Sequence, residues 1–359
     1  MATLAGVSLI LLIVLFAYSA RRPMTGNATM NLFPAKVIAE EGRHFFRWNE
    51  SAPVVYANFH PPLYVNVLAA AFLIGGVSDL SARVANLLLV LAVMGLMIAV
   101  AVRISGDRAR GMKTGLLAVA LYAVNPAVLQ SILTTDPDGT LLNLAIILTV
   151  YLLVSDFAGK PSWHVVTVGF GFALSLWSKE TTPVFLAGLV LVHAWVSGGK
   201  HITVPRLFLA VGLGAVLFWG TYVAYCWTTG LSPFYMVQYA LGLIHGEKRI
   251  VDLLKGLLYE IKIDFVWLNL FLVGAAFLAS EMWGRWRSGR EAWRTWSIVE
   301  IVGIGIYAIY FIIIISKGAI VPRYKIPALS FLSLIVARWV VRSWDGEAVE
   351  MGGRGHSSG

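Results

Sequence analysis

Charged residues are scarce in this sequence. Asp, Glu, Lys and Arg make up 13% of the 359 residues, whereas a soluble globular domain carries about 25%. Hydrophobic residues make up 58% and the mean hydropathy is +0.76, which excludes a water-soluble enzyme, a disordered chain and a coiled coil. The apolar residues fall in long blocks, such as 4–20, 84–102 and 298–315. Blocks of about 20 residues have the length of a bilayer-spanning helix, so we expect a polytopic membrane protein.

Cysteine is almost absent, since the chain has one. Cys226 alone excludes an intramolecular disulfide framework and a cysteine-based zinc site. The net charge of +9 comes largely from short Arg and Lys clusters between apolar blocks, where anionic lipid headgroups, and not nucleic acid, are the expected partners. The first apolar block exceeds a signal-peptide core and has no basic flank before it, so we expect a retained helix.

The spacing of the apolar blocks predicts an all-α fold with about ten membrane spans. Between the first two spans, the mixed polar and aromatic segment 21–58 and the short apolar run 63–74 predict external interfacial helices. We expect this segment to pack over the turn at 136–139. The predicted spans are 4–20, 84–102, 115–133, 140–154, 165–177, 183–196, 207–227, 265–279, 298–315 and 326–337.

Short basic loops predict the orientation. Arg and Lys cluster at 103–113, at 285–294 and at 338–342, and such loops favour the cytoplasmic side. Both termini are therefore expected in the cytoplasm. Segment 21–58, the turns at 136–139 and at Lys179, and loop 317–325 then share the external side, although Arg21 and Arg22 oppose this bias.

One conspicuous motif is His60-Pro61-Pro62. Two prolines fix the backbone and make a rigid helix start. His60 is then placed to donate a hydrogen bond to an anion, or simply to cap a helix at the membrane surface.

The turn Thr135–Gly139 carries two carboxylates, Asp136 and Asp138, at a predicted helix start. Carboxylates suit the positive end of a helix dipole. A structural cap and a site facing a sugar hydroxyl or an ammonium group are both open interpretations.

Two cationic positions lie at span ends. Lys179 and Glu180 separate two short spans, where ionisable residues favour function, although a mutual ion pair is the simpler interpretation. Arg323 and Tyr324 precede the last span. Arg323 suits phosphate oxygens, or it extends to lipid headgroups.

Glu40 and His44 would share a face if their segment were helical. Two ligands with no third nearby make a poor metal site, so we predict no metal and no cofactor.

Taken in order, the motifs resemble one family. The series runs through 60–63, 76–83, Asn125-Pro126, 136–142, 177–179 and 322–324. It is similar to that of the GT-C fold glycosyltransferases that use polyprenyl-phosphate sugars, such as protein O-mannosyltransferases and lipid A aminoarabinose transferases. The resemblance spans about residues 1–200 and one short motif near the C-terminus.

The resemblance implies a fold and a function. It implies a GT-C-like core at 1–200 with external loop 21–62, variable helices at 201–345, and a Gly/Ser-rich tail at 346–359. It implies an inverting sugar transfer, on the external face, from a polyprenyl-phosphate donor to a protein, lipid or glycan acceptor. His60, Lys179, Arg323 and Tyr324 are the expected donor-binding residues.

The position at which the family carries a catalytic acid is Asn27 here. An amide cannot accept a proton from an acceptor hydroxyl, so Asn27 is expected to bind substrate and not to act as a base. The candidate carboxylates are Asp138, then Asp136, and then Glu40 and Glu41.

Two other functions stay open. Asn27 is compatible with a non-catalytic relative that binds a lipid-linked sugar or a partner protein. A lipid or sugar transporter is the second, but transporters place charges within spans and show repeat symmetry, whereas the charges here lie almost entirely between the predicted spans.

The basic loops generate a test of the topology. Cysteines introduced at Ser162 and Ser288 should resist labelling from outside intact cells, because both positions fall on the predicted cytoplasmic side. Efficient labelling at both would contradict the orientation.

Overall fold

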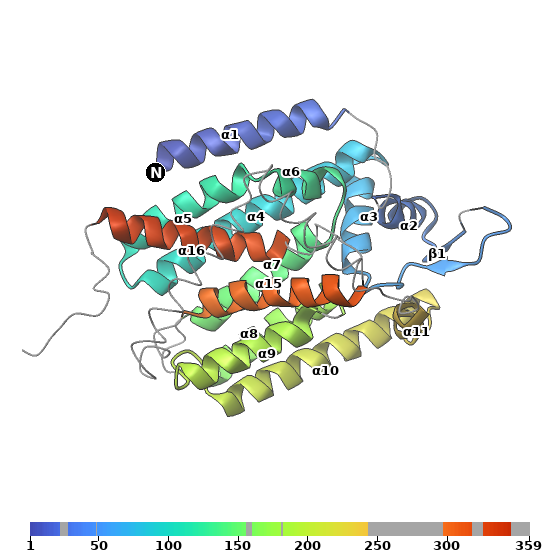
Figure 1. The fold of residues 1–359 in the computed structure, drawn as a ribbon. Coiled ribbons are helices and arrows are strands. Elements are labelled where there is room, and N and C mark those ends of the chain that lie inside the picture. The colour runs from blue at the N-terminus through green and yellow to red at the C-terminus, as the bar shows by residue number, and fades with distance from the viewer. Residues whose placement is uncertain are drawn as a thin grey trace, which may run out of the picture.

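The computed structural model describes residues 1–21, 28–47, 49–155, 160–180, 182–242, 297–317 and 326–345. These residues are almost entirely helical, as predicted (Figure 1). The exception is a small antiparallel hairpin of β1 (Phe45–Phe46) and β2 (Val55–Tyr56). The helices are α1 (Ala2–Ser19), α2 (Ala28–Glu41), α3 (Leu63–Gly75), α4 (Asp79–Ser105), α5 (Arg108–Ala123), α6 (Pro126–Leu133), the π-helix η1 (Asp138–Leu142), α7 (Asn143–Val154), α8 (Pro161–Ser178), α9 (Thr182–Val196), α10 (Val204–Thr229), α11 (Tyr235–Gly242), α15 (Ile298–Lys317) and α16 (Ile326–Trp344).

Within the described residues, four helices are long and apolar enough to cross a membrane: α1, α4, α10 and α16. The bent pair α5–α6 makes a fifth if it counts as one span. The protein is thus an integral membrane protein, but this number is below the ten spans that were predicted. Several predicted spans, such as 140–154 and 183–196, form apolar helices that are shorter than a full crossing. The predicted span 265–279 lies outside the described residues.

The predicted span at 115–133 is not one straight helix. α5 and α6 meet at a 65° bend. Asn125 caps α6, since its side-chain oxygen accepts a 3.0 Å hydrogen bond from the Ala127 N–H, and Pro126 occupies the first turn. Proline cannot continue the hydrogen bonds of α5, so the helix ends and restarts in a new direction.

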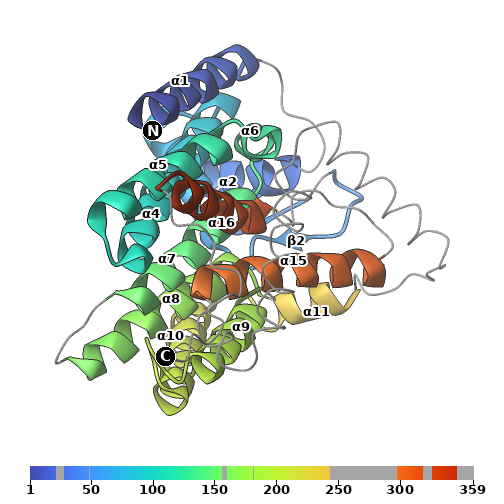
Figure 2. The same ribbon diagram turned by 60° about the vertical axis from the view of Figure 1, so that its left-hand side comes forward.

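Of the four candidate spans in the described residues, α16 is the most buried. Figure 2 shows it beside α5, α4 and α7, and it also packs on α15. Every residue from Ile326 to Ala337 is buried. A helix buried on all sides carries apolar residues around its whole circumference. α1 is the opposite case, because most of its apolar side chains, such as Val7 and Ile10, are exposed and suit contact with lipid.

Small residues bring helices together. In α8 and α10, a Cβ on Gly214 would lie 2.7 Å from the Gly169 carbonyl oxygen. Gly111 and Gly115 of α5 approach the backbone of α4 in the same way. Close backbone approach through small residues is a main source of helix association in membranes.

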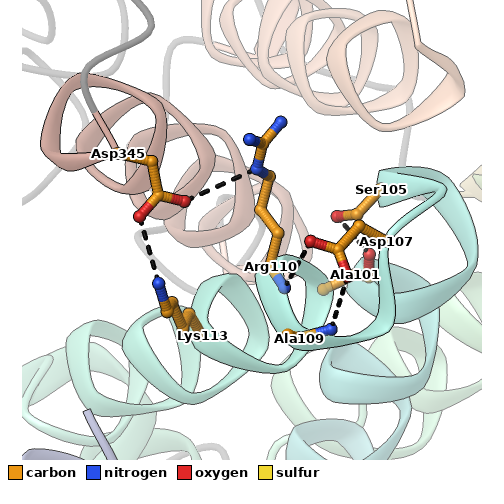
Figure 3. Close-up of polar contacts among 7 residues, drawn as sticks. All are labelled: Ala101, Ser105, Asp107, Ala109, Arg110, Lys113 and Asp345. Atoms are coloured by element: carbon orange, nitrogen blue, oxygen red, sulfur yellow. Dashed lines mark hydrogen bonds and ion pairs between the residues drawn. The ribbon is translucent and has the colours of Figure 1, made fainter.

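The helix bundle has two ends, which are formed by different segments of the chain. α2, α3, β1 and α11 lie at one end and the N-terminus at the other (Figure 1). At the N-terminal end, Figure 3 shows Asp345 between Lys113 Nζ at 3.0 Å and Arg110 Nε at 3.5 Å. The hydrogen bond from Lys113 lowers the pKa of Asp345, and Arg110 adds to the effect. This link is therefore fully present above the ordinary pKa of aspartate and is lost only in more acidic solution.

The described external segment is structured, as predicted. α2 packs on α3, and Asn31 Nδ2 donates a 3.4 Å hydrogen bond to the carbonyl oxygen of Thr135. The helix therefore contacts the residue that precedes the turn at 136–139, while the hairpin after it was not predicted. Which end faces the cytoplasm stays a prediction.

The glycine contact of α8 and α10 generates a matched pair of variants. Gly214→Ala should destabilise the protein by about 1–3 kcal/mol, because the added methyl group overpacks the helix contact. Gly212→Ala, two residues away on the same helix, should be neutral or slightly stabilising, because no atom lies within 4 Å of the new Cβ. Thermal unfolding in detergent measures both. Equal melting temperatures would contradict the close contact.

Candidate functional site

The site is built on the turn between α6 and α7. Thr135 has a φ of +49°, in the left-handed region that β-branched residues avoid. Its neighbour Asp136 turns back to donate its N–H to the Ser131 carbonyl at 3.2 Å. Thr135, Asp136 and Asp138 are all buried. Strained backbone of this kind is found preferentially at functional sites, where the surrounding structure holds it in place.

The turn continues directly into the π-helix η1. Asp138 N–H donates to Asp136 Oδ1 at 3.3 Å, and Thr140 Oγ1 donates to the Asp136 carbonyl oxygen at 2.6 Å. Gly139 is required here, because a Cβ would lie 2.5 Å from Ser131 Cβ. Single π-helical turns inside α-helices are often functional. The wide turn places the Asp138 carboxylate at the end of α8.

Lys179 meets that carboxylate. It follows the last residue of α8, and its backbone N–H still bonds the Ser175 carbonyl at 3.0 Å. Lys179 Nζ forms an ion pair with Asp138 Oδ1. The side chains are 17% and 3% exposed. Two charges are therefore held together with little water around them, which requires close pairing.

The next residue, Glu180, forms a second pair with His60. Glu180 Oε1 lies 3.1 Å from His60 Nδ1. Burial alone would raise the pKa of Glu180, but the hydrogen bond and the charge of His60 outweigh it and lower the pKa. The charge of Lys179 also lowers the pKa of Glu180, but less than His60 does. Each residue pairs with a different segment.

A polar network supports the turn from the side of α3 and α4. Tyr64 Oη donates to Asn86 Oδ1 at 2.8 Å, and Asn86 Nδ2 donates to the Ile132 carbonyl at 3.2 Å. Arg83 donates to the carbonyl oxygens of Leu133 and Ala20. The bonds to Ile132 and Leu133 satisfy the last carbonyl groups of α6, and the bond to Ala20 does the same at the end of α1.

The charge of the Asp136 carboxylate also affects the pKa of Tyr64. α3 is too short to cross a membrane, and burial followed by the charge of Asp136 raises the pKa of the Tyr64 hydroxyl well above its usual value. Tyr64 therefore stays a neutral hydrogen-bond donor beside the turn.

Aromatic rings surround His60. Phe59 and Tyr239 contact its ring with centroids 5.0 and 5.9 Å away. Tyr235 contacts Tyr239, and Tyr56 contacts Tyr235. These ring contacts join the hairpin, the His60 segment and α11.

The structure thus brings Asp138, Lys179, Asp136 and His60 to one end, on three segments that ion pairs link. Glu40 and Glu41 form their ion pairs in another part of the protein. They lie at the exposed end of α2, where they pair with Lys36 and Arg43. Asn27, Arg323 and Tyr324 lie outside the described residues.

Some residues of the site were not predicted. Glu180 was noted only as a partner for Lys179, and Tyr64 and Asn86 were not singled out. A signal for Asn86 was present, because it is a polar residue within the predicted span 84–102. His44 does not share a helix face with Glu40, since α2 ends at Glu41. Its Nδ1 instead lies 2.9 Å from the Tyr225 hydroxyl. In the described part of the chain, no three His, Cys, Asp or Glu residues are grouped to hold a metal ion.

The Asp138–Lys179 pair generates a stability test. Lys179→Met leaves the Asp138 charge buried without its ammonium partner, and breaking a buried pair costs about 3–5 kcal/mol. Combining it with Asp138→Asn removes the second charge and should recover much of that loss. Unfolding in detergent measures the two single variants and the double variant. If the losses add, the two side chains do not interact.

Comparison with known proteins finds a matching family model and similar solved structures. Residues 59–223 match the family model described as dolichyl-phosphate-mannose-protein mannosyltransferase. No curated protein sequence matches the chain. The crystal structure of ArnT from Cupriavidus metallidurans bound to undecaprenyl phosphate is similar, with a TM-score of 0.63 at 16% identity. ArnT in the apo state gives 0.62 at 15%.

Both structural matches cover 95% of this chain and 61% of ArnT, so the chain spans about three fifths of the length of these relatives. The family match includes His60, Asp138 and Lys179. The family match thus covers the central part of the chain, and the likeness to ArnT shows that the chain has a fold of the same kind.

Proposed function

We propose that this protein transfers a sugar from a polyprenyl-phosphate-linked donor to a protein, lipid or glycan acceptor on the external face of the membrane. The observation that carries the proposal is the buried Asp138–Lys179 pair, which lies within the family match and on a fold similar to that of an undecaprenyl-phosphate-bound protein. No resident cofactor is part of the proposal.

Cations at this end suit the donor. When a sugar leaves its phosphate, negative charge develops on the phosphate oxygens, and fixed cations that stabilise this charge lower the barrier. Lys179 is the best-placed cation, because Asp138 holds its ammonium group at the end of α8. Arg323 and Tyr324 precede α16 in the sequence, and we propose that they bind the same phosphate. Asn27 is proposed to contact the sugar or the acceptor.

Asp138 and Asp136 have a positioning role in this proposal. The Asp138 carboxylate fixes Lys179, and Asp136 fixes the backbone of Asp138. Glu40 and Glu41 stay candidate acids only if α2 moves, because both are now paired on its exposed end.

The transporter alternative is less well supported. Transporters place their binding sites near the middle of the membrane, whereas the pairs Asp138–Lys179 and His60–Glu180 lie where helices end. A non-catalytic binding protein is a separate outcome of the test below.

The direct test is sugar transfer by the purified protein in lipid nanodiscs. The donors are undecaprenyl-phosphate mannose and undecaprenyl-phosphate aminoarabinose, and membranes of the source organism supply the acceptor. Lys179→Met should lose at least about 100-fold in turnover, as expected for removal of one preorganised stabilising group.

The matched control is Lys113→Met, which removes a lysine at the opposite end of the bundle and should keep full activity. Binding of undecaprenyl phosphate without any transfer would identify a non-catalytic relative. Movement of the labelled donor across vesicles without acceptor would identify a transporter.

Arg323 gives a second test of the donor site. Arg323→Lys keeps the charge but loses the two parallel hydrogen bonds that a guanidinium offers to phosphate. Donor affinity should therefore fall in this variant, and by about 2–5 kcal/mol in Arg323→Ala if the contact is buried. Undecaprenyl phosphate binding to folded preparations is the measurement. Parent-like affinity in both variants would show that Arg323 contacts lipid headgroups only.

A further inference from the structure

The His60–Glu180 pair has the geometry of an oriented base. Glu180 Oε1 lies 3.1 Å from His60 Nδ1, and an ionised carboxylate only accepts hydrogen bonds. Nδ1 therefore carries the hydrogen. In the neutral ring, the lone pair is then on Nε2, which has no hydrogen-bond partner among the described residues. A carboxylate that fixes the tautomer of a histidine in this way is the arrangement that proton-accepting histidines use in hydrolases.

His60 is also the accessible member of the site. Its side chain is 41% exposed, whereas the Glu180 side chain is 18% exposed and the Asp138 side chain 3%. Asp138 is covered and paired with Lys179. A substrate hydroxyl approaching from outside can therefore reach the imidazole before it reaches the Asp138 carboxylate.

The ring of His60 is held in place from several sides. Pro61 and Pro62 follow it and lead directly into α3. Phe59 packs on one side of the ring and Tyr239 on another. A general base must sit within hydrogen-bond reach of its proton in a fixed direction, and these contacts provide that direction.

We propose that His60 is the general base of the sugar transfer and that Glu180 is its positioning residue. This inference rests on the function proposed above. The acceptor oxygen forms the new bond to the anomeric carbon, and its proton moves to His60 Nε2. The bond between the anomeric carbon and the phosphate oxygen breaks, and its electron pair leaves with the polyprenyl phosphate beside Lys179.

The proposal predicts a pH dependence. Among the described residues, the charged or titratable groups around His60 are Glu180 at 3.1 Å, Lys179 next to it in the chain, and the Tyr239 hydroxyl of the contacting ring. Only the neutral imidazole can accept the proton, so the rate should fall in acidic solution. Glu180→Gln removes the carboxylate that favours the protonated ring, so the rate of this variant should fall at a lower pH than that of the parent.

The experiment measures release of undecaprenyl phosphate from the active donor in nanodiscs, with the full-length protein and the native acceptor membranes. His60→Gln should lose about 100- to 10,000-fold in rate, the usual range for a general base, while undecaprenyl phosphate binding is retained. Glu180→Gln should lose less and show the shifted pH profile. His164→Gln is the control, because this half-buried histidine bonds Leu153 at the other end of α8.

The outcomes separate this inference from the proposed function. If the parent transfers sugar but both variants keep its rate and pH profile, His60 is not the base and the function stands. If His60→Gln loses donor binding, His60 is a phosphate ligand and the inference is wrong. If His60→Gln fails to fold, an unmoved pH profile in Glu180→Gln overturns it alone. No transfer by the parent with either donor would contradict the proposed function itself.

Discussion

The Asp138–Lys179 ion pair is the interaction on which the arrangement of the site depends. It joins the end of α8 to the turn before α7, two segments that the chain otherwise connects only through the lengths of both helices. Removing two charges from water is costly, and close pairing offsets that cost. Once the pair forms, the turn is fixed, and so are Glu180 and its partner His60. The Arg83 and Asn86 hydrogen bonds to the end of α6 secure the same turn from its other side.

The ion pairs also determine how the site meets a charged substrate. Within the described residues, Lys179 and His60 each already have a carboxylate partner. Under the proposed function, a donor phosphate competes with Asp138 for Lys179, so this contact exchanges one anionic partner for another. The net attraction of Lys179 for the phosphate is then greatest when negative charge on the phosphate increases, as the proposed departure of the sugar requires.

The sequence allowed the membrane class, the helical fold and several site residues to be predicted, because each has a local signal. Long apolar blocks mark α4 and α10, and Asp138, Lys179 and His60 each lie at a helix boundary marked by proline or by charge. The bend at Asn125 had such a signal too, because proline disfavours a helical residue before it. The apolar residues on both sides of Asn125 predicted one span, so the proline signal for a bend was overlooked. The pairing of Glu180 with His60 had no local signal. It depends on how α8 and α3 pack, and spacing in the sequence does not reveal that contact.

The backbone of Thr135 has a consequence of a different kind. Glycine would adopt its left-handed conformation without strain, so a chain selected for thermal stability alone would be expected to carry glycine at this position. Threonine there carries backbone strain but is stiffer, since a β-branched residue has fewer alternative conformations. Under the proposed function, Thr135 is therefore a position at which stability and activity are in opposition, as they commonly are in enzymes. Attempts to make this protein more robust should leave this turn unchanged and act on the lipid-facing helices instead.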